Sequence, residues 1–544
     1  MLRHGASWPY RAVEVIAGEP HVLRDDLCAA DPAARPAGRP LLCLIHVTDL
    51  QLADVQSPTR FEFLNRYFAD PRYAGLVPVQ RPQEALTPHA VDATVRTVNA
   101  LRGPATGQPP ALAVTTGDAI DNAQWNEVQA FLALFDGGRV TPDSGGPGYA
   151  GVQALDWPDD IFWKPDGVGP DGPDFFRREL GFPHHPGLLE AALREFTAGG
   201  LEMPWLSCFG NHEALNQGVG TQTAGLAAAL TGDRKPFRLT DEFDSDEALE
   251  LFAVRPEAFM AGPSRQVPAD PGRRPVTRGE FVAAHFRSGA RPLGHGFTTE
   301  NLRNETAYYV HDTPAARFIA LDTNCLAGGA DGCLDRLQAR WLEDRLAEVH
   351  SAYRGTAGEQ IRTGQDDRLV ILFSHHGVDT LDNTRGWHPG PGGEPLIGAA
   401  DLVTLLHRYP NVVLWLNGHT HTNAVRPRPD PDCPGRGFWE VTTCAVVDWP
   451  CQTRLMELAD SGGQLSITCT MVDHDTPLGP RVLGGQPLAS TARFSIDDLA
   501  ALHRELAANI PFGGTHPGRA GTVTDRNVEL LISAPFPLAR LPGA

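Results

Sequence analysis

Five short apolar segments constrain the fold of this chain more than any other feature of its sequence. Each is about five to eight residues long, the length of a strand buried on both faces, and each ends in Asp, Asn or His. The segments are RPLLCLIHVTDLQ, PPALAVTTGDAIDN, EMPWLSCFGNHEA, DRLVILFSHHGVD and NVVLWLNGHTHTN. Helical patterns lie between several of them, at residues 89–102, 125–136, 334–350 and 399–409. This alternation of strand and helix predicts an α/β fold.

Further strand patterns follow one another without intervening helices. They are TAYYVHD, ARFIALDT, FWEVTTCAVV, TRLMELAD and QLSITCTMVDH. The last two flank Ser461-Gly462-Gly463, a sequence typical of a hairpin turn. These segments predict two sheets or one mixed sheet.

Two long segments differ in composition from the rest of the chain. Residues 139–203 and 214–303 are rich in Pro, Gly and Asp and carry only patches of helix, such as residues 186–200. Each separates two of the site-bearing strands. We expect one domain over residues 1–480, with these two segments as insertions that cap the site, because long ordered loops beside a site are usually functional. Solvated decoration is the alternative.

The remaining residues, 481–544, are expected to form a C-terminal extension packed on the core. The extension contains one strong helical pattern, SIDDLAALHRELAANI. Ser495 and Asp498 at its start form a capping-box pattern, in which each side chain bonds to the other residue's backbone N–H.

Charge and cysteine usage narrow the class of partner. The formal net charge is −20 and no run of Lys or Arg occurs, which argues against nucleic acid or an anionic membrane as the main partner. No segment approaches a transmembrane span and no signal peptide is recognised, so a cytoplasmic protein is expected, or an exported one if a signal sequence was removed. None of the nine cysteines forms a CxxC pair, so a zinc ribbon is not supported. In an exported protein, Cys325 with Cys333, or Cys433 with Cys451, would be candidate disulfides.

Polar side chains follow each of the five strands. Open α/β sheets bind ligands at the carboxyl ends of their strands, and these ends carry Asp49, Gln51, Asp118, Asn211, His212, His375, His376, His419 and His421. Residues i and i+2 of an extended segment point to the same side, so Asp49 with Gln51, and His419 with His421, would each present two side chains to one pocket. Mixed carboxylate, amide and imidazole ligands suit Mn²⁺, Fe²⁺, Zn²⁺ or Co²⁺, whereas Ca²⁺ would take nearly all oxygens. Two metals are possible if one Asp bridges them.

The ordered set DLQ, GDAIDN, GNHE, SHH and GHTH resembles the signature of the calcineurin-like metallophosphoesterases. That signature is Asp-x-His, Gly-Asp, Gly-Asn-His-Asp/Glu, a His and Gly-His-x-His. The resemblance spans roughly residues 41–425, interrupted by the two insertions. It implies a four-layer α/β/β/α sandwich of two mixed sheets flanked by helices. It also implies metal-dependent hydrolysis of a small phosphoester, either a phosphodiester or a phosphomonoester.

The resemblance implies a role for each motif residue. The first metal would be held by Asp49, Asp118 and His421, and the second by Asp118, Asn211, His375 and His419. A hydroxide bridging the two ions would attack phosphorus. His212 would stabilise the phosphoryl group and protonate the leaving oxygen, and Glu213 would orient His212. The implied cofactors are two divalent or trivalent ions of Mn, Fe or Zn, and the implied partner is a small phosphorylated substrate.

The chain departs from the family pattern at Gln51, where the signature has a His. A Gln carbonyl is a neutral and weaker ligand, so Gln51 would bind the first metal poorly, bind it through water, or only hydrogen-bond to the site. The family His directly follows the apolar strand, which matches His375 and leaves His376 to support the site or face the substrate. Further candidates for substrate contact are Asn211, Arg385, Trp387, His388 and Asn423.

Two other classes of function remain open. The substitution at Gln51 is consistent with a non-catalytic or weakly catalytic metal-binding scaffold. The same dinuclear site would also serve a hydrolase or an oxidative enzyme that acts on a non-phosphate substrate. No G-x-G-x-x-G or G-x-x-x-x-G-K-[ST] sequence occurs in a strand-to-helix turn, which argues against an NAD or ATP enzyme.

Overall fold

The five apolar segments all form strands. In the computed structural model, which describes residues 2–4, 9–29, 38–146, 148–385, 396–476, 494–510 and 518–543, these strands are β4 (Arg39–Val47), β5 (Leu112–Thr115), β8 (Trp205–Leu206), β15 (Leu369–Phe373) and β16 (Val412–Asn417). Apart from the first two residues of β4, every residue in these strands is buried. Burial on both faces explains why the segments are continuously apolar and do not alternate.

Three of these strands belong to a seven-stranded mixed sheet. Its order is β3 (Val22–Arg24), β21 (Val528–Ser533), β20 (Gln464–Asp473), β19 (Gln452–Asp460), β4, β5 and β8. Strands β4, β5 and β8 are parallel, so their carboxyl ends lie at the same edge of the sheet. The hairpin between β19 and β20 is confirmed, and the Ser461 N–H closes its turn by donating to the Gln464 carbonyl at 2.9 Å.

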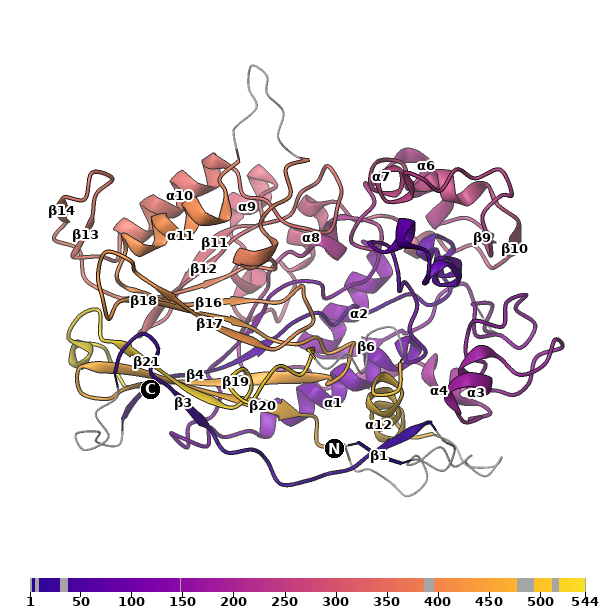
Figure 1. The fold of residues 1–544 in the computed structure, drawn as a ribbon, viewed down its shortest axis with the longest axis horizontal. Helices are drawn as coiled ribbons and strands as arrows, with labels where there is room; N and C mark the ends of the chain where they lie inside the picture. Colours follow the sequence, from indigo (N-terminus) through magenta and orange to yellow (C-terminus); the bar gives the residue numbers. More distant parts are fainter. Residues whose placement is uncertain are drawn as a thin grey trace, which may run out of the picture.

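The other two strands belong to a six-stranded mixed sheet. Its order is β11 (Tyr309–Asp312), β12 (Ala316–Ala320), β15, β16, β18 (Gly437–Thr442) and β17 (Ala424–Pro429). The four central strands are parallel, and both edge strands are antiparallel to their neighbours. The predicted α/β fold with two mixed sheets is therefore confirmed, and helices flank both sheets (Figure 1).

Alternate residues of the six-stranded sheet face two different hydrophobic clusters. Phe318 and Ala320 belong to the cluster that β4, β5, α1 (Thr87–Ala100) and α2 (Trp125–Asp136) share. Ile319 and Leu321 belong to the cluster formed with α10 (Arg336–Ala347) and α11 (Ala399–His407). The period-two burial of β12 thus attaches one sheet to helices on one face and to the other sheet on its opposite face.

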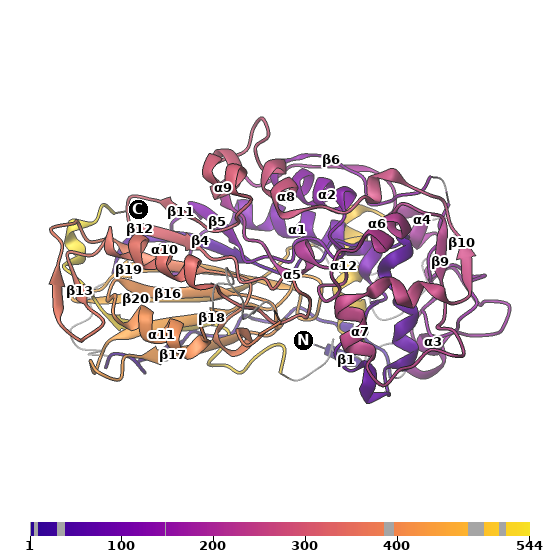
Figure 2. The same ribbon diagram turned by 90° about the horizontal axis from the view of Figure 1, so that it is seen from above.

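One predicted helix is shorter than expected. The pattern over residues 186–200 gives only α4 (Leu188–Ala192), and Phe196–Ala198 instead forms strand β7, paired with β6 (Gly138–Val140). Residues 196–198 pair with the backbone of β6, and helical periodicity in the sequence does not reveal this pairing. The C-terminal helix is confirmed as α12 (Ile496–Ala507), which packs against α1 (Figure 2). Its capping box is present, with the Asp498 N–H donating to Ser495 Oγ at 3.1 Å.

The other helices and strands lie mainly in terminal, inserted and connecting segments. They are β1 (Leu2–His4), β2 (Arg11–Val13), α3 (Phe175–Leu180), α5 (Asn211–Ala214), α6 (Ala224–Leu230), β9 (Arg234–Pro236), α7 (Ala248–Val254), β10 (Ser264–Gln266), α8 (Arg278–Ala284), α9 (Thr299–Asn304), β13 (Ala352–Arg354) and β14 (Gln360–Arg362). Within the described ranges, no helix combines the length and apolar character needed to cross a membrane.

A segment that the sequence patterns did not distinguish precedes α1. It is built of four short 3₁₀ helices, η1 (Pro58–Arg60), η2 (Glu62–Tyr67), η3 (Pro71–Tyr73) and η4 (Glu84–Leu86). Phe61 of this segment packs edge-to-face on Phe252 of the second insertion, with ring centroids 5.1 Å apart. The segment and the insertion therefore form one cluster, beside the carboxyl ends of the site-bearing strands (Figure 1).

Candidate metal centre

The backbone at the strand ends is unusual. Five candidate ligands have left-handed φ angles, namely Asp49 (51°), Gln51 (42°), Asp118 (53°), His419 (66°) and His421 (54°). A non-glycine residue in such a conformation costs about 1–3 kcal/mol, and residues of this kind cluster at functional sites. The expectation of extended i and i+2 pairs is therefore wrong, because β4 and β16, like β5, are followed by left-handed residues. The turns nevertheless bring the paired side chains to one place.

Asp49 lies at the centre of the first group and is completely buried. Its Oδ2 accepts hydrogen bonds from Thr48 Oγ1 at 2.7 Å and from the His419 N–H at 3.1 Å. Its Oδ1 lies 3.2 Å from His421 Nε2. Gly418 makes this approach possible, since a Cβ there would overlap Thr48 Oγ1 and lie 2.5 Å from Asp49 Oδ2. The glycine of the GHTH motif is thus required by close packing.

Asp118 lies at the centre of the second group. Its Oδ1 accepts the His212 N–H at 2.9 Å, and its Oδ2 lies 3.1 Å from His375 Nε2. Burial opposes ionisation, but the neighbouring imidazoles of His375 and His212 outweigh it and lower the pKa of Asp118. Burial likewise favours a neutral His375, yet the carboxylates of Asp118 and Asp49 raise the pKa of His375 to about 9. A bound proton on His375 therefore compensates the buried negative charge.

Four buried atoms of the candidate ligands have no hydrogen-bond partner. They are Asp49 Oδ1, Gln51 Oε1, Asn211 Oδ1 and His375 Nε2. Among the described residues, Gln51 Oε1 and Asn211 Oδ1 have no polar partner at all, and such a buried atom costs about 1–3 kcal/mol when left unsatisfied. Asp49 Oδ1 and His375 Nε2 meet only ion-pair partners, His421 Nε2 at 3.2 Å and Asp118 Oδ2 at 3.1 Å. Asp49, Asp118 and His375 bring ligand atoms within 4.8 Å of one another. This donor set fits a cation, which would take the place of the proton on His375.

In three candidate ligands, a hydrogen bond or ion pair to one polar atom of the side chain determines which other atom is left to bind a metal. The Nδ1–H of His375 donates to the Thr116 carbonyl at 2.8 Å, which leaves Nε2 as the ligand atom. Asn211 Nδ2 donates to the Gly218 carbonyl at 3.0 Å, which leaves Oδ1. His421 Nδ1 lies 2.7 Å from Asp448 Oδ2, which leaves Nε2 facing Asp49. Such outer partners are typical of metal-binding side chains.

The second histidine of the SHH motif is occupied on both nitrogens. His376 Nδ1 lies 2.9 Å from Thr323 Oγ1, and its Nε2 lies 2.9 Å from the Ala330 carbonyl. His376 is completely buried and its ring centroid is 4.4 Å from that of His419. Although His375, His376 and His419 come close enough to hold an ion, the two existing contacts make His376 a support for the loop that carries Ala330.

Gln51 and His212 form a pair at the open side of the centre. Gln51 Nε2 lies 3.2 Å from His212 Nε2, while Gln51 Oε1 stays unpartnered. His212 Nδ1 lies 2.6 Å from the Asp121 carbonyl, which can only accept, so Nδ1 carries the proton. The Gln51 amide then donates to the lone pair of His212 Nε2. Part of the His212 side chain is exposed, at 15%.

Glu213 does not contact the His212 ring, contrary to the role expected for it. Its carboxylate accepts four backbone N–H groups, from Gly210 (2.6 Å), Asp118 (2.8 Å), Ala119 (2.6 Å) and Ile120 (3.3 Å). Complete burial, followed by repulsion from Asp118, raises the pKa of Glu213 to about 8. Glu213 therefore holds the turn that carries Asp118, and the Asp121 carbonyl is what orients His212.

Two predicted substrate contacts point elsewhere. Asn423 is 1% exposed, and its Oδ1 accepts from the Cys444 N–H at 3.0 Å and from Arg454 at 3.1 Å. Arg385 is paired with Glu250 of the second insertion. Trp387 and His388 lie outside the described residues. The two hydrogen bonds that Asn423 accepts make it a packing residue behind the centre.

Two carboxylates next to the centre were not singled out from the sequence. Asp448 lies beside His421 and also pairs with Arg81 and Arg519. Burial opposes its ionisation, but Arg81 and Arg519 outweigh it and hold the pKa of Asp448 well below its usual range. The signal was present, since Asp448 ends the apolar run CAVV as the other ligands end theirs. Asp331, in a Gly-rich loop, had no such signal.

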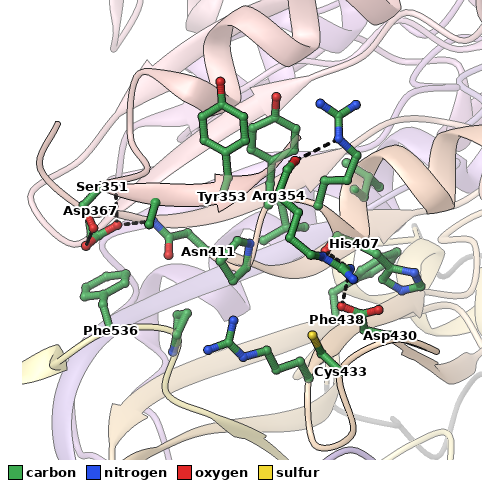
Figure 3. A pocket seen from close by; sticks show the side chains of 18 of the residues that line it. Ser351, Tyr353, Arg354, Asp367, His407, Asn411, Asp430, Cys433, Phe438 and Phe536 are labelled. Carbon is green, nitrogen blue, oxygen red and sulfur yellow. Dashed lines mark hydrogen bonds and ion pairs between the residues drawn. The ribbon is translucent and has the colours of Figure 1, made fainter. Parts of the chain in front are cut away.

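A separate cavity lies away from the centre, at the amino ends of β15 and β16 (Figure 3). It has a volume of about 330 Å³, and its lining includes Tyr353, Arg354, Asn411 and Phe438 but none of the candidate ligands.

All nine cysteines are free, so neither candidate disulfide forms. Neither the protein-family models nor the curated proteins contain a match to this chain.

Proposed function

We propose that this chain is a calcineurin-like metallophosphoesterase that hydrolyses a small phosphoester, either a diester or a monoester. The observation that carries the proposal is the convergence of buried oxygen and nitrogen atoms that make no hydrogen bond, from the ends of strands in two different sheets. The two sheets would be the inner layers of a four-layer α/β/β/α sandwich. The cofactors would be two ions of Mn, Fe or Zn.

The donor atoms divide into two groups around Asp118. The first ion would be held by Asp49, Gln51, Asp118 and His421, and the second by Asp118, Asn211, His375 and His419. Mixed oxygen and nitrogen donors suit borderline divalent ions. When bound, such ions supply Lewis-acid activation of the phosphoryl group and of the attacking water.

His212 is the candidate proton donor of the reaction. Its Nδ1–H is anchored on the Asp121 carbonyl, so Nε2 is the atom that would carry a proton to the leaving oxygen. A protonated Nε2 cannot accept from the Gln51 amide, because both groups would then be donors. The contact from the Gln51 amide therefore requires a neutral His212. When His212 is protonated, the substrate would replace Gln51 as its partner.

The partial exposure of His212 favours a catalyst over an inert scaffold. A scaffold that only binds metal needs the ligands that the centre contains, but it has no use for an anchored imidazole facing the opening. A hydrolase or oxidative enzyme for a non-phosphate substrate would use the same ligands, and the substrate panel below separates these possibilities.

Elemental analysis combined with ester hydrolysis tests the proposal. Purified protein should hold two equivalents of metal and should hydrolyse bis-p-nitrophenyl phosphate or p-nitrophenyl phosphate. Asp118→Asn should lose metal and activity together. His212→Asn should retain the metal and lower kcat by about 10²–10⁴-fold, the usual contribution of a general acid. Full activity of a folded, metal-free Asp118→Asn protein would refute the proposal, and two metals without any ester hydrolysis would support the scaffold.

A further inference from the structure

Four guanidinium groups reach the loops around the centre, and all four are paired with carboxylates. Arg60 lies 3.2 Å from Asp121 and 2.7 Å from Glu84, with both partners buried. Arg81 and Arg519 both pair with Asp448. Arg385 pairs with Glu250. Arg60 and Arg385 are thus matched by carboxylates of their own, whereas Arg81 and Arg519 share the single carboxylate of Asp448.

Asp331 differs from these arginines because it is a charged side chain near the centre that is not paired with a side chain of Arg or Lys among the described residues. It lies in the loop between β12 and α10, and its side chain is 53% exposed. Its Oδ1 is 3.6 Å from His419 Nε2, which is longer than a direct hydrogen bond. Across the part of the chain that the structure describes, Asp331 has no ion pair with Arg or Lys. An exposed negative charge therefore stands beside His419, a proposed ligand of the second ion.

The loop holds Asp331 in place on both sides. Its own carbonyl accepts from Asn383 Nδ2 at 2.7 Å, and the Gly332 N–H donates to the Thr380 carbonyl at 2.8 Å. The preceding Ala330 carbonyl is bound by His376. The Asp331 backbone is thus held at this position, within reach of His419.

A doubly charged phosphomonoester would be attracted by the two proposed ions but repelled by the unpaired carboxylate of Asp331. A singly charged diester would meet less repulsion, since the interaction between charges scales with their product.

We infer that Asp331 makes this site select phosphodiesters over phosphomonoesters, with a neutral or cationic group on the substrate next to Asp331. The inference rests on the proposed function and narrows its substrate class. Hydrolysis would break the bond from phosphorus to the leaving oxygen and form a bond from water oxygen to phosphorus. The leaving oxygen takes the proton of His212, and a proton of water passes to solvent. The monoester product carries an additional charge, so the same carboxylate favours its release.

Kinetics with two esters that share one leaving group test the inference. Wild-type protein should show a higher kcat/KM for bis-p-nitrophenyl phosphate than for p-nitrophenyl phosphate. Asp331→Asn should raise kcat/KM for the monoester by about five- to tenfold, the effect of one partly screened charge, and that for the singly charged diester by only about two- to threefold. Asp331→Glu keeps the charge and should keep the preference.

Asp366→Asn is the matched control. Asp366 is also exposed, but it precedes β15 and so lies at the opposite end of the sheet from the centre. Its replacement should leave both kcat/KM values unchanged. The metal content of every variant is measured in parallel. Loss of metal by Asp331→Asn would assign Asp331 to positioning His419 and would overturn the inference.

Binding of two non-hydrolysable probes separates this inference from the proposed function. Calorimetry on the manganese-loaded protein at mildly alkaline pH would compare phenylphosphonate, which carries two charges, with its monomethyl ester, which carries one. Asp331→Asn should tighten binding of the dianion by about five- to tenfold and that of the monoanion by only about two- to threefold. Equal changes for both probes, no change for either, or no binding of either probe would overturn the inference. Retention of the charge preference without ester hydrolysis would refute the proposed function alone.

Discussion

Gln51 is the residue at which this centre differs most from a histidine-rich set of ligands. Its amide has two ends with different surroundings, since Oε1 has no partner and Nε2 contacts His212. In the proposed centre, the amide would link the first ion to the protonation state of the candidate acid.

Replacement of Gln51 should affect one ion selectively. Gln51→Ala removes one neutral ligand, and we expect the affinity for one of two metal equivalents to fall by about 10–100-fold, the loss typical for groups that support a metal. Titration of the metal-free protein with Mn²⁺ measures the two affinities. Gln153→Ala is the control, because Gln153 is also buried but donates to the Pro82 carbonyl away from the centre. Equal weakening of both equivalents would contradict the division of ligands proposed for Gln51.

The stability of the metal-free protein should depend on pH through His375. Its pKa is raised to about 9 in the folded state, against about 6.5 in an unfolded chain. The stabilisation by its positive charge is therefore complete below about pH 6.5 and is lost as pH rises through about 9. Glu213, with its pKa raised to about 8, acts in the same direction because its ionisation is disfavoured in the folded state. The midpoint of thermal unfolding should fall over this range.

The matched variant for this measurement is His375→Gln, which removes the titrating group. Its thermal midpoint should fall less over the same pH range. A midpoint of the metal-free wild type that rises between about pH 6.5 and about pH 9 would show that the buried carboxylates near His375 are neutralised in another way.

At the scale of elements, the turns that follow the strands depend on glycine. Gly418→Ala would place a methyl group against Thr48 and Asp49, so we expect a loss of about 1–3 kcal/mol of stability together with weaker metal binding. Denaturant unfolding and metal titration measure the two effects. Gly398→Ala is the control, because a Cβ there meets no atom closer than 4.0 Å. A Gly418→Ala protein with unchanged metal affinity would show that β16 can shift without disturbing Asp49.

Buried charge joins the 3₁₀ segment to the loop that supports His212. Arg60 of η1 contacts Glu84 of η4 and Asp121, and its side chain is 1% exposed. Arg60→Met should cost about 3–5 kcal/mol, because it leaves buried carboxylates without a partner. The exposed pair of Arg139 with Glu195 is the control, and Arg139→Met should leave the unfolding midpoint unchanged. Comparable effects of the two substitutions would argue against a structural role for the Arg60 cluster.

The features that could be predicted from the sequence are those that depend on residues close together in the chain. Buried strands followed by Asp, Asn or His were predictable because burial on both faces requires continuous apolar residues. The left-handed turns were not, since Asp49 and His421 take their backbone conformation from close packing across two sheets. Asp331 likewise approaches His419 through a loop distant in sequence, so no local pattern places it at the centre.

At the scale of the whole molecule, removal of metal should destabilise the fold. The candidate ligands converge only in the folded chain, so a bound ion stabilises that state by mass action. Metal at 100 times its dissociation constant adds about 2.7 kcal/mol for each site. Differential scanning calorimetry with and without a chelator should therefore show a lower midpoint after chelation. Asp118→Asn should show no such difference, and a wild-type midpoint insensitive to chelation would contradict a resident metal.

The division of the ligands between two sheets also sets an order during synthesis. Asp49, Asp118 and Asn211 leave the ribosome long before His375, His419 and His421. Strand β19, which pairs with β4 in the first sheet, is made later still. A nascent chain therefore exposes carboxylates and amides for most of its synthesis without the imidazoles that complete the donor set. The metals proposed for this centre would therefore bind only near the end of translation, after the last candidate ligand has emerged.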